Sequence, residues 1–275
     1  GFFHRVAICR DCGHIQLYPL LSPVLLEKIN NNFFTGLYAG DCKKNRKNDE
    51  IKKEMLHNRI RKYIRKQIRV LDVGAGGGWA LEYFKNQKCD YFAIERSPAL
   101  ARSITEKGGR IIGNTLFDDY SVYQHYFDIV IFRHVLEHVL DPRKALYFLK
   151  QLINDSGIIY LALPNAQNPL GNRGFMNIHK KGFRTSFIRP VHISYFCEGN
   201  VFRLARSVGL KPILSDNSTE LFCILSLGKD QFFEEYNYYE QQKKIFVNTA
   251  KATLVSDYIN ICADFPKALI KRIIL

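Results

Sequence analysis

The sequence predicts an α/β fold in which a seven-stranded, mostly parallel sheet is covered by helices on both faces. From residue 69 onward, short apolar runs alternate with amphipathic stretches, as expected when helices connect parallel strands. Two of these stretches begin at Ser97-Pro98 and Asp141-Pro142, where an N-cap residue precedes a proline at the first helical position. The last two apolar runs follow each other without a helix between them, which indicates that the final strand is antiparallel.

The apolar runs define the expected strands in order. They lie at residues 70–73, 91–95, 110–112, 127–132, 157–163, 211–214 and 221–227. A helix is expected at about residues 198–208, because Gly209 follows it as a typical C-terminal stop.

Length and composition favour one large domain with appendages. The chain has 275 residues, of which 47% are hydrophobic, so it can bury a sizeable core. We expect an N-terminal segment at residues 1–45, the α/β domain at 46–228 with a long insertion at 164–195, and a helical extension at 229–275. A loop as long as that insertion usually has a function or is disordered.

Several properties of the sequence indicate a cytoplasmic protein. No apolar run approaches the ~20 residues that cross a bilayer, and the first residues do not have the pattern of a signal peptide. The seven cysteines are too irregularly spaced for a disulfide framework, so reduced thiols are expected. The net charge of +14 is concentrated in two clusters, which are typical of either a solvated helix face or a site for an anionic partner.

A glycine-rich loop follows the first strand and has the pattern Asp72-x-Gly74-x-Gly76-x-Gly78. Glycines between a strand and a helix let a ligand approach the backbone N–H groups closely. The dinucleotide fingerprint requires a small residue where Trp79 stands, so NAD is not favoured. A P-loop is excluded because no Gly-Lys-Ser/Thr follows.

With this loop, the chain resembles the class I S-adenosylmethionine-dependent methyltransferases, which have a Rossmann-like fold. The resemblance covers roughly residues 50–227. It includes Phe127-Asp128-Ile129-Val130 and the E-H-x-x-D-P stretch that begins at Glu137. The resemblance implies that Gly74, Gly76 and Gly78 hold the methionine part of the cofactor and that Asp72 holds its amino group.

The resemblance implies further cofactor contacts at the ends of other strands. Glu95 would bind both ribose hydroxyls, and Asn114 would accept a hydrogen bond from the adenine amino group in place of the usual aspartate. His134 precedes the E-H-x-x-D-P stretch and is expected at the same site. Tyr38 is expected to fold over the cofactor, although an aromatic residue on a helix is more often part of the core.

Two histidines are the candidates for catalysis. His138 follows the fourth strand, and His192 precedes a helix. Either could act as the general base that an acceptor with a proton to lose requires, or could be a hydrogen-bonded structural residue.

No metal is predicted at this catalytic site. His134-x-x-Glu137-His138 also matches a zinc-peptidase motif, but that motif needs a long helix, and here it starts where a strand ends. Cys9-x-x-Cys12 resembles one half of a zinc ribbon. A structural zinc is expected only if a second cysteine pair lies upstream of Gly1.

The acceptor is expected to be a small molecule. The basic insertion suits a phosphorylated substrate such as a nucleotide-linked sugar or another glycan precursor. A quinone or lipid acceptor is an alternative. The tail FPKALIKRIIL is typical of a cationic amphipathic helix, which either contacts a membrane surface peripherally or packs on the protein. Nucleic acid is disfavoured, since the motif of base-methylating enzymes is missing after the fourth strand. A noncatalytic, regulatory cofactor-binding protein is the remaining alternative.

Overall fold

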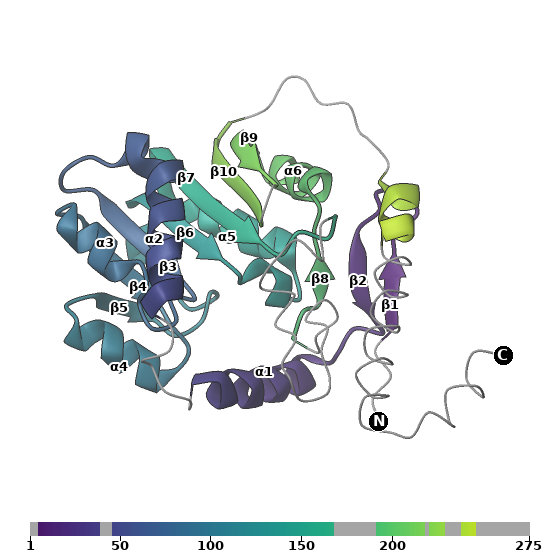
Figure 1. Cartoon of the computed structure of the whole chain (residues 1–275), viewed down its shortest axis with the longest axis horizontal. Coiled ribbons are helices and arrows are strands. Elements are labelled where there is room, and N and C mark those ends of the chain that lie inside the picture. The colour runs from purple at the N-terminus through teal and green to yellow at the C-terminus, as the bar shows by residue number, and fades with distance from the viewer. Residues whose placement is uncertain (1–4, 39–45, 168–190, 218–219, 229–237, 246–275) are drawn as a thin grey trace.

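The computed structural model describes residues 5–38, 46–167, 191–217, 220–228 and 238–245. It contains one large sheet, a second small sheet and the helices that connect them (Figure 1). Most of the expected insertion and nearly all of the expected C-terminal extension lie outside the described residues.

The large sheet has seven strands in the order β5-β4-β3-β6-β7-β10-β9. Their bounds are β3 (Arg69–Val73), β4 (Asp90–Ile94), β5 (Arg110–Gly113), β6 (Phe127–Arg133), β7 (Ile153–Leu163), β9 (Leu210–Asp216) and β10 (Leu221–Leu227). Only β10 runs antiparallel to its neighbours, β7 and β9. The predicted fold class, including the reversed last strand, is therefore confirmed.

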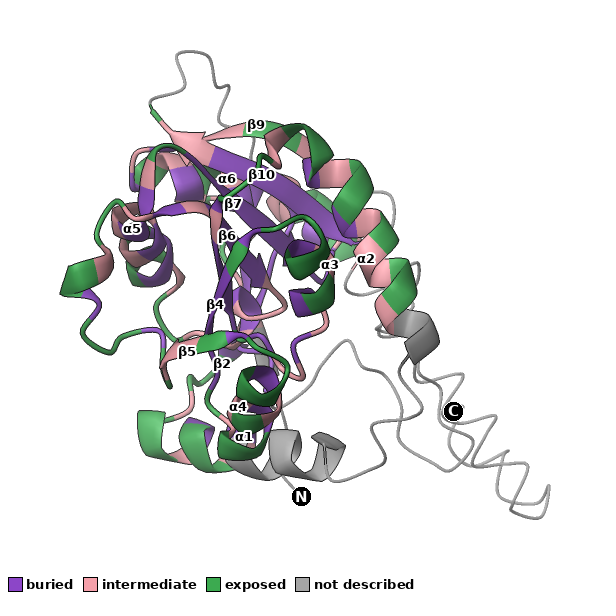
Figure 2. Cartoon of the chain, turned by 90° about the vertical axis from the view of Figure 1, so that its left-hand side faces the viewer, coloured by how far each residue is buried: buried purple, intermediate pink, exposed green. Residues whose placement is uncertain are grey.

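Helices cover both faces of this sheet, and Figure 2 shows the buried strands between their more exposed helices. One face packs against α2 (Arg46–Ile60), α3 (Leu81–Asn86) and α4 (Pro98–Glu106). The other packs against α5 (Pro142–Leu152) and α6 (Glu198–Ser207). Alternate residues of each strand point to opposite faces, so within β3 Val70 joins one core, and Leu71 and Val73 join the other.

The helix starts follow the predicted capping chemistry at one of the two expected sites. At α5, Asp141 Oδ1 accepts a hydrogen bond from the Lys144 amide at 2.9 Å. At α4, the Ser97 side chain makes no such bond, and the proline at the start of the helix is the part of the predicted signal that is present. The described residues also include the short 3-10 helices η2 (Arg61–Tyr63), η3 (Ser121–Tyr123) and η4 (Leu136–His138).

Strand β7 begins four residues before the predicted start. Ile153 pairs with Phe127, and the register then shifts before Ile158 pairs with Ile129. Gly157 lies in this irregular part, where a Cβ atom would come within 2.9 Å of the Phe127 carbonyl oxygen. The residues just before Gly157 are polar, so the apolar pattern did not predict that the strand begins there.

The small sheet combines the N-terminus with a segment from the far end of the insertion. Its strands are β1 (Arg5–Ile8), β2 (Ile15–Tyr18) and β8 (Ser194–Tyr195), in the order β1-β2-β8. Figure 1 shows β1 and β2 beside β8, with helix α1 (Pro23–Tyr38) following the hairpin. The sequence did not predict this sheet, because a two-residue strand has no recognisable pattern.

The described part of the C-terminal extension lies against the same hairpin. Residues 239–245 are helical, and a Cβ atom at Gly13 would meet the backbone carbonyl carbon of Tyr238 at 2.5 Å. In the described parts of the chain, none of the helices is both long and apolar enough to cross a bilayer.

Candidate functional site

The glycine loop lies at the carboxyl end of β3, at the centre of the parallel part of the sheet. Gly74, Gly76 and Gly78 all have positive φ angles, of 70°, 57° and 73°, which glycine adopts without strain. A Cβ atom at Gly74 would lie 2.6 Å from Val135 Cγ2, so this loop packs closely on the segment after β6. At Gly77 an added Cβ would meet nothing within 4 Å, so this side of the loop is open.

Glu95 is buried at the carboxyl end of the neighbouring strand β4 and is held by the glycine loop. Its Oε2 accepts a hydrogen bond from the Gly76 amide at 2.6 Å, and its Oε1 accepts one from the Ser97 amide at 2.8 Å. Burial raises the pKa of Glu95, while the backbone donors oppose that shift. Each carboxylate oxygen retains a second lone pair, so the group can bind two further donors.

Asp72 lies just below the loop and is almost completely buried. Tyr91 donates its hydroxyl proton to Asp72 Oδ2 at 2.6 Å. Burial raises the pKa of Asp72 to about 7, Glu95 adds to the shift, and the Tyr91 hydrogen bond and Arg133 oppose it. A cation bound beside Asp72 would favour the ionised form of its carboxyl group, and the two charges would then attract each other.

Two other residues that the resemblance assigns to the cofactor, Asn114 and Tyr38, are at the margin of this region. Asn114 follows β5 and is exposed, and its amide donates to Asp118 Oδ2 at 2.9 Å. Tyr38 is the last residue of α1, and its side chain lies outside the part that the structure describes.

His134 participates in an ion-pair network that the sequence did not reveal. Its Nε2 lies 3.1 Å from Glu220 Oε2, and the same carboxylate receives Arg59 at 2.7 Å and Arg133 at 2.8 Å. This surplus of cationic partners holds the pKa of buried Glu220 well below its usual range, although burial alone would raise it. Burial lowers the pKa of His134. The network joins α2, β6 and the start of β10.

His138 and His192 lie together beside this network. Their ring centroids are 4.9 Å apart at an interplanar angle of 68°. His138 belongs to η4, and its Nδ1 lies 2.7 Å from the carbonyl oxygen of Val191, next to His192. The Ile193 amide also donates to the Glu137 carbonyl at 2.8 Å, so the two segments are held in register.

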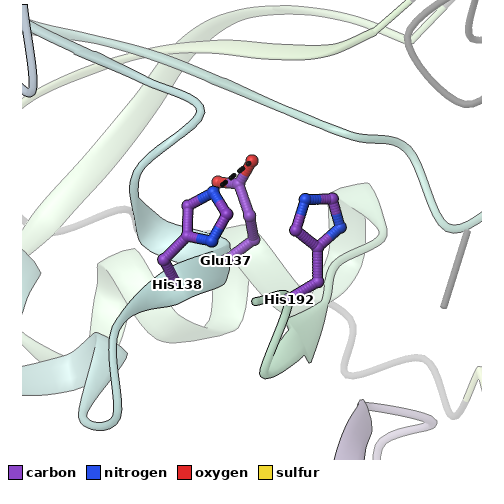
Figure 3. Close-up of side chains that lie close together, drawn as sticks. All are labelled: Glu137, His138 and His192. Atoms are coloured by element: carbon purple, nitrogen blue, oxygen red, sulfur yellow. Dashed lines mark ion pairs between the residues drawn. The ribbon is translucent and has the colours of Figure 1, made fainter. Parts of the chain in front are cut away.

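Glu137 completes this group, although it was not among the residues predicted for the site. Figure 3 shows the side chains of Glu137, His138 and His192 projecting to the same side. Glu137 Oε1 lies 3.8 Å from His138 Nε2 and 3.6 Å from His134 Nδ1. Burial raises the pKa of Glu137 to about 8, with Glu220 adding to the shift and Arg133 opposing it. The sequence signal for Glu137 was the H-x-x-E-H motif, whereas His138 and His192 were already predicted as candidates for catalysis.

The N-terminal cysteine pair forms the turn between β1 and β2. The Gly13 amide donates to the Cys9 carbonyl, and the Cys9 amide donates to the His14 carbonyl, both at 2.8 Å. Among the described residues, no group of potential metal ligands includes Cys9, Cys12 or His14. Cys42, another cysteine of the N-terminal segment, lies outside the described residues.

The family model and the curated relatives that match this chain are methyltransferases. A family model described as a methyltransferase domain matches residues 45–215. The ubiquinone biosynthesis O-methyltransferase of Cereibacter sphaeroides is 28% identical over 160 residues, which are 53% of this chain and 61% of that protein. A protein of the same name from Coxiella burnetii is 28% identical over 168 residues, 54% of this chain and 71% of that one. The chain thus spans about six tenths of the length of the first of these relatives.

Solved structures show the same fold at low sequence identity. The 1,6-didemethyltoxoflavin-N1-methyltransferase of Burkholderia thailandensis aligns with a TM-score of 0.55 and 17% identity, over 80% of this chain and 97% of that one. The PH0226 protein of Pyrococcus horikoshii aligns with a TM-score of 0.53 and 16% identity, over 65% and 90% of the two chains.

Proposed function

This chain belongs to the S-adenosylmethionine-dependent methyltransferases, and we propose that it methylates a hydroxyl oxygen of a small molecule. The observation that carries the proposal is the pair of histidines, His138 and His192, whose rings lie 4.9 Å apart beside the segment that packs on the glycine loop. An oxygen acceptor has a proton to lose, and an imidazole is the side chain best suited to take it near neutral pH.

The residues at the carboxyl edge fit the cofactor. The open side of the loop at Gly77 gives room for a ligand against bare backbone, and buried Asp72 suits an ammonium group. Glu95 is oriented by two backbone amides and can accept two hydroxyl groups. When bound there, S-adenosylmethionine supplies an electrophilic methyl group on a sulfonium.

The protein's own part in the reaction is to position the acceptor and move one proton. When the acceptor oxygen takes up the methyl group, its hydroxyl proton would pass to the His138–His192 pair. Holding the two reacting atoms in line provides most of the acceleration, and a positioned base adds on the order of 10²- to 10⁴-fold.

Of the acceptor classes that the sequence left open, we favour a hydroxylated quinone-type ring. The relatives named above are O-methyltransferases of ubiquinone biosynthesis, and their similarity supports an oxygen acceptor on such a ring. The basic residues that suggested a nucleotide-linked sugar are at positions 171–190, outside the described residues.

The test is turnover of the full chain with S-adenosylmethionine and matched acceptors: hydroxylated quinols, nucleotide-linked sugars and amines. We expect an O-methylated ring product, identified by mass and NMR. His192→Ala should lower turnover far more than cofactor affinity, with His57→Ala, an exposed histidine on α2, as the matched control.

Three results would overturn the proposal. Methylation of nitrogen or carbon would refute the oxygen acceptor. Preference for nucleotide-linked sugars would establish the other acceptor class. Cofactor binding with no turnover on any acceptor would favour a noncatalytic, regulatory protein.

A further inference from the structure

We propose that Glu137, His138 and His192 form a site for one divalent transition-metal ion, and that this ion binds the acceptor oxygen. The first part stands on the geometry of the three side chains. The second part rests on the proposed function.

The three residues offer one ligand atom each within a small volume. Two imidazole nitrogens and one carboxylate oxygen all lie within 4.8 Å of one another, and Figure 3 shows them converging from two segments. Zinc–nitrogen bonds are about 2.0–2.1 Å long, so tetrahedral ligand atoms lie roughly 3.3 Å apart. Glu137 Oε1 and His138 Nε2, at 3.8 Å, are already close to such a separation. The remaining adjustment is within the reach of side-chain rotation.

Glu137 is a buried carboxylate of the kind that a cation would stabilise. Its side chain is 1% exposed, and neither carboxylate oxygen has a hydrogen-bond partner on another described residue. Arg133 favours its ionised form, but the guanidinium forms its ion pair with Glu220, and the rings that lie beside the Glu137 carboxylate are those of His134 and His138, at 3.6 and 3.8 Å. Burial makes an ionised carboxylate costly at this place, and a bound cation would stabilise that form.

The backbone prepares His138 for coordination. Its Nδ1 lies 2.7 Å from the Val191 carbonyl oxygen, which can only accept, so the proton is on Nδ1 and the lone pair is on Nε2. Nε2 is the atom that faces Glu137. A metal-binding histidine commonly has this arrangement, in which a backbone carbonyl fixes the tautomer and the orientation of the ring.

The ligand set indicates which ions would bind. Mg²⁺ prefers oxygen ligands, whereas two imidazoles and one carboxylate suit Zn²⁺, Fe²⁺, Mn²⁺ or Co²⁺. Three protein ligands also leave a coordination position for an oxygen from outside, as catalytic zinc sites do. An ion there would lower the pKa of a coordinated hydroxyl. The imidazoles would then be ligands, so the ion would replace the histidine pair as the group that promotes loss of the proton, and the proton would leave to solvent.

The experiment measures binding separately from catalysis. The purified full chain is treated with a chelator, dialysed and titrated with Co²⁺, and its visible absorption spectrum and bound-metal content are recorded. We expect one equivalent to bind. Glu137→Gln and His192→Ala should each weaken binding by at least roughly 100-fold, because the loss of residues that merely orient ligands already costs 10- to 100-fold.

Matched controls separate this site from others. His57→Ala removes an exposed histidine from α2, and Cys9→Ser with Cys12→Ser removes the cysteine pair, and neither should change Co²⁺ binding. Circular dichroism and melting temperature check that Glu137→Gln, which keeps the size of the side chain, is folded. Equal Co²⁺ affinity in the parent and in folded Glu137→Gln would overturn the site, as would binding that is lost only in the cysteine variant.

The role of the ion is tested by turnover of the metal-depleted chain. Activity on a hydroxylated quinol should fall at least tenfold after chelation and return with Zn²⁺ or Mn²⁺. Undiminished activity without metal would refute the role of the ion and leave the proposed function intact. Absence of O-methylation in the metal-loaded parent would refute the proposed function. The Co²⁺ titration would still show whether the metal site exists.

Discussion

The two halves of the carboxyl edge are built differently. Around the glycine loop, the carboxylates already have partners, because Asp72 accepts from Tyr91, and Glu95 accepts from two backbone amides. On the other side of Val135, Glu137 lies buried without a hydrogen-bond partner on another described residue. The first half is a preformed cradle within the α/β domain. The second is assembled from η4 and a segment that the N-terminal hairpin holds.

The largest expected effect is the loss of cofactor binding when Gly76 in the first half is replaced. Gly76→Val forces a β-branched residue to a φ of 57°, which costs about 1–3 kcal/mol, and moves the amide that orients Glu95. We expect the loss of measurable S-adenosylmethionine binding by calorimetry. Circular dichroism and the melting temperature check that Gly76→Val is folded. Unchanged affinity in Gly76→Val would remove the loop from the cofactor site.

Glu95→Gln should have the next largest effect. The amide keeps one acceptor oxygen for the Gly76 or Ser97 amide but loses the charge that binds the ribose hydroxyls. Hydrogen bonds to charged groups contribute about 1.5–3 kcal/mol, so calorimetric affinity should fall roughly 10- to 100-fold. Glu50→Gln, on the exposed face of α2, is the matched control. A large drop in melting temperature without ligand would indicate that Glu95 is mainly structural.

The pH dependence of cofactor affinity tests the role of Asp72 in the first half. Its pKa is about 7, so between pH 6 and 7.5 its ionised fraction rises roughly eightfold, and affinity for the cationic cofactor should rise by a similar factor. The titratable and charged groups that face it are the neutral phenol of Tyr91, Glu95 and Arg133. Asp72→Asn should bind more weakly and lose this dependence. A parent curve that is flat over this range would contradict the assignment.

The same group has a predictable effect on stability without cofactor. Because the pKa of Asp72 is higher in the folded chain than in the unfolded chain, its protonation favours folding. That contribution is complete below pH 4 and is lost as the pH rises toward 7. Denaturant unfolding of the parent and of Asp72→Asn should therefore converge at acidic pH and diverge near neutrality.

The smallest expected effect concerns the hairpin. Asn200 is buried and donates to the Cys12 carbonyl at 2.8 Å, which fixes α6 to the β1–β2 turn. Asn200→Ala should cost about 1–3 kcal/mol and lower turnover while leaving cofactor affinity unchanged. Asn58→Ala, on the exposed surface of α2, is the control. An equal loss of cofactor affinity would show that the two halves are not independent.

The sequence was more informative about the cradle than about the rest. The loop, Asp72 and Glu95 lie at the ends of two adjacent strands, and the apolar pattern locates strand ends well. His138 and His192 were identified as separate candidates, but their proximity depends on the Ile193–Glu137 hydrogen bond and on β8, which no local pattern reveals. Glu220 and its arginines are far apart in sequence, so only the fold brings them together.

The pairing of β2 with β8 has a consequence for protein engineering. Ile15 pairs with Tyr195, and Leu17 bonds to Ile193, so the backbone that carries His192 is an extension of the chain's own first hairpin. A graft intended to change which molecule is methylated must therefore transplant residues 5–18 together with 191–200. If only one of these two segments were transplanted, it would lack the strand that it pairs with.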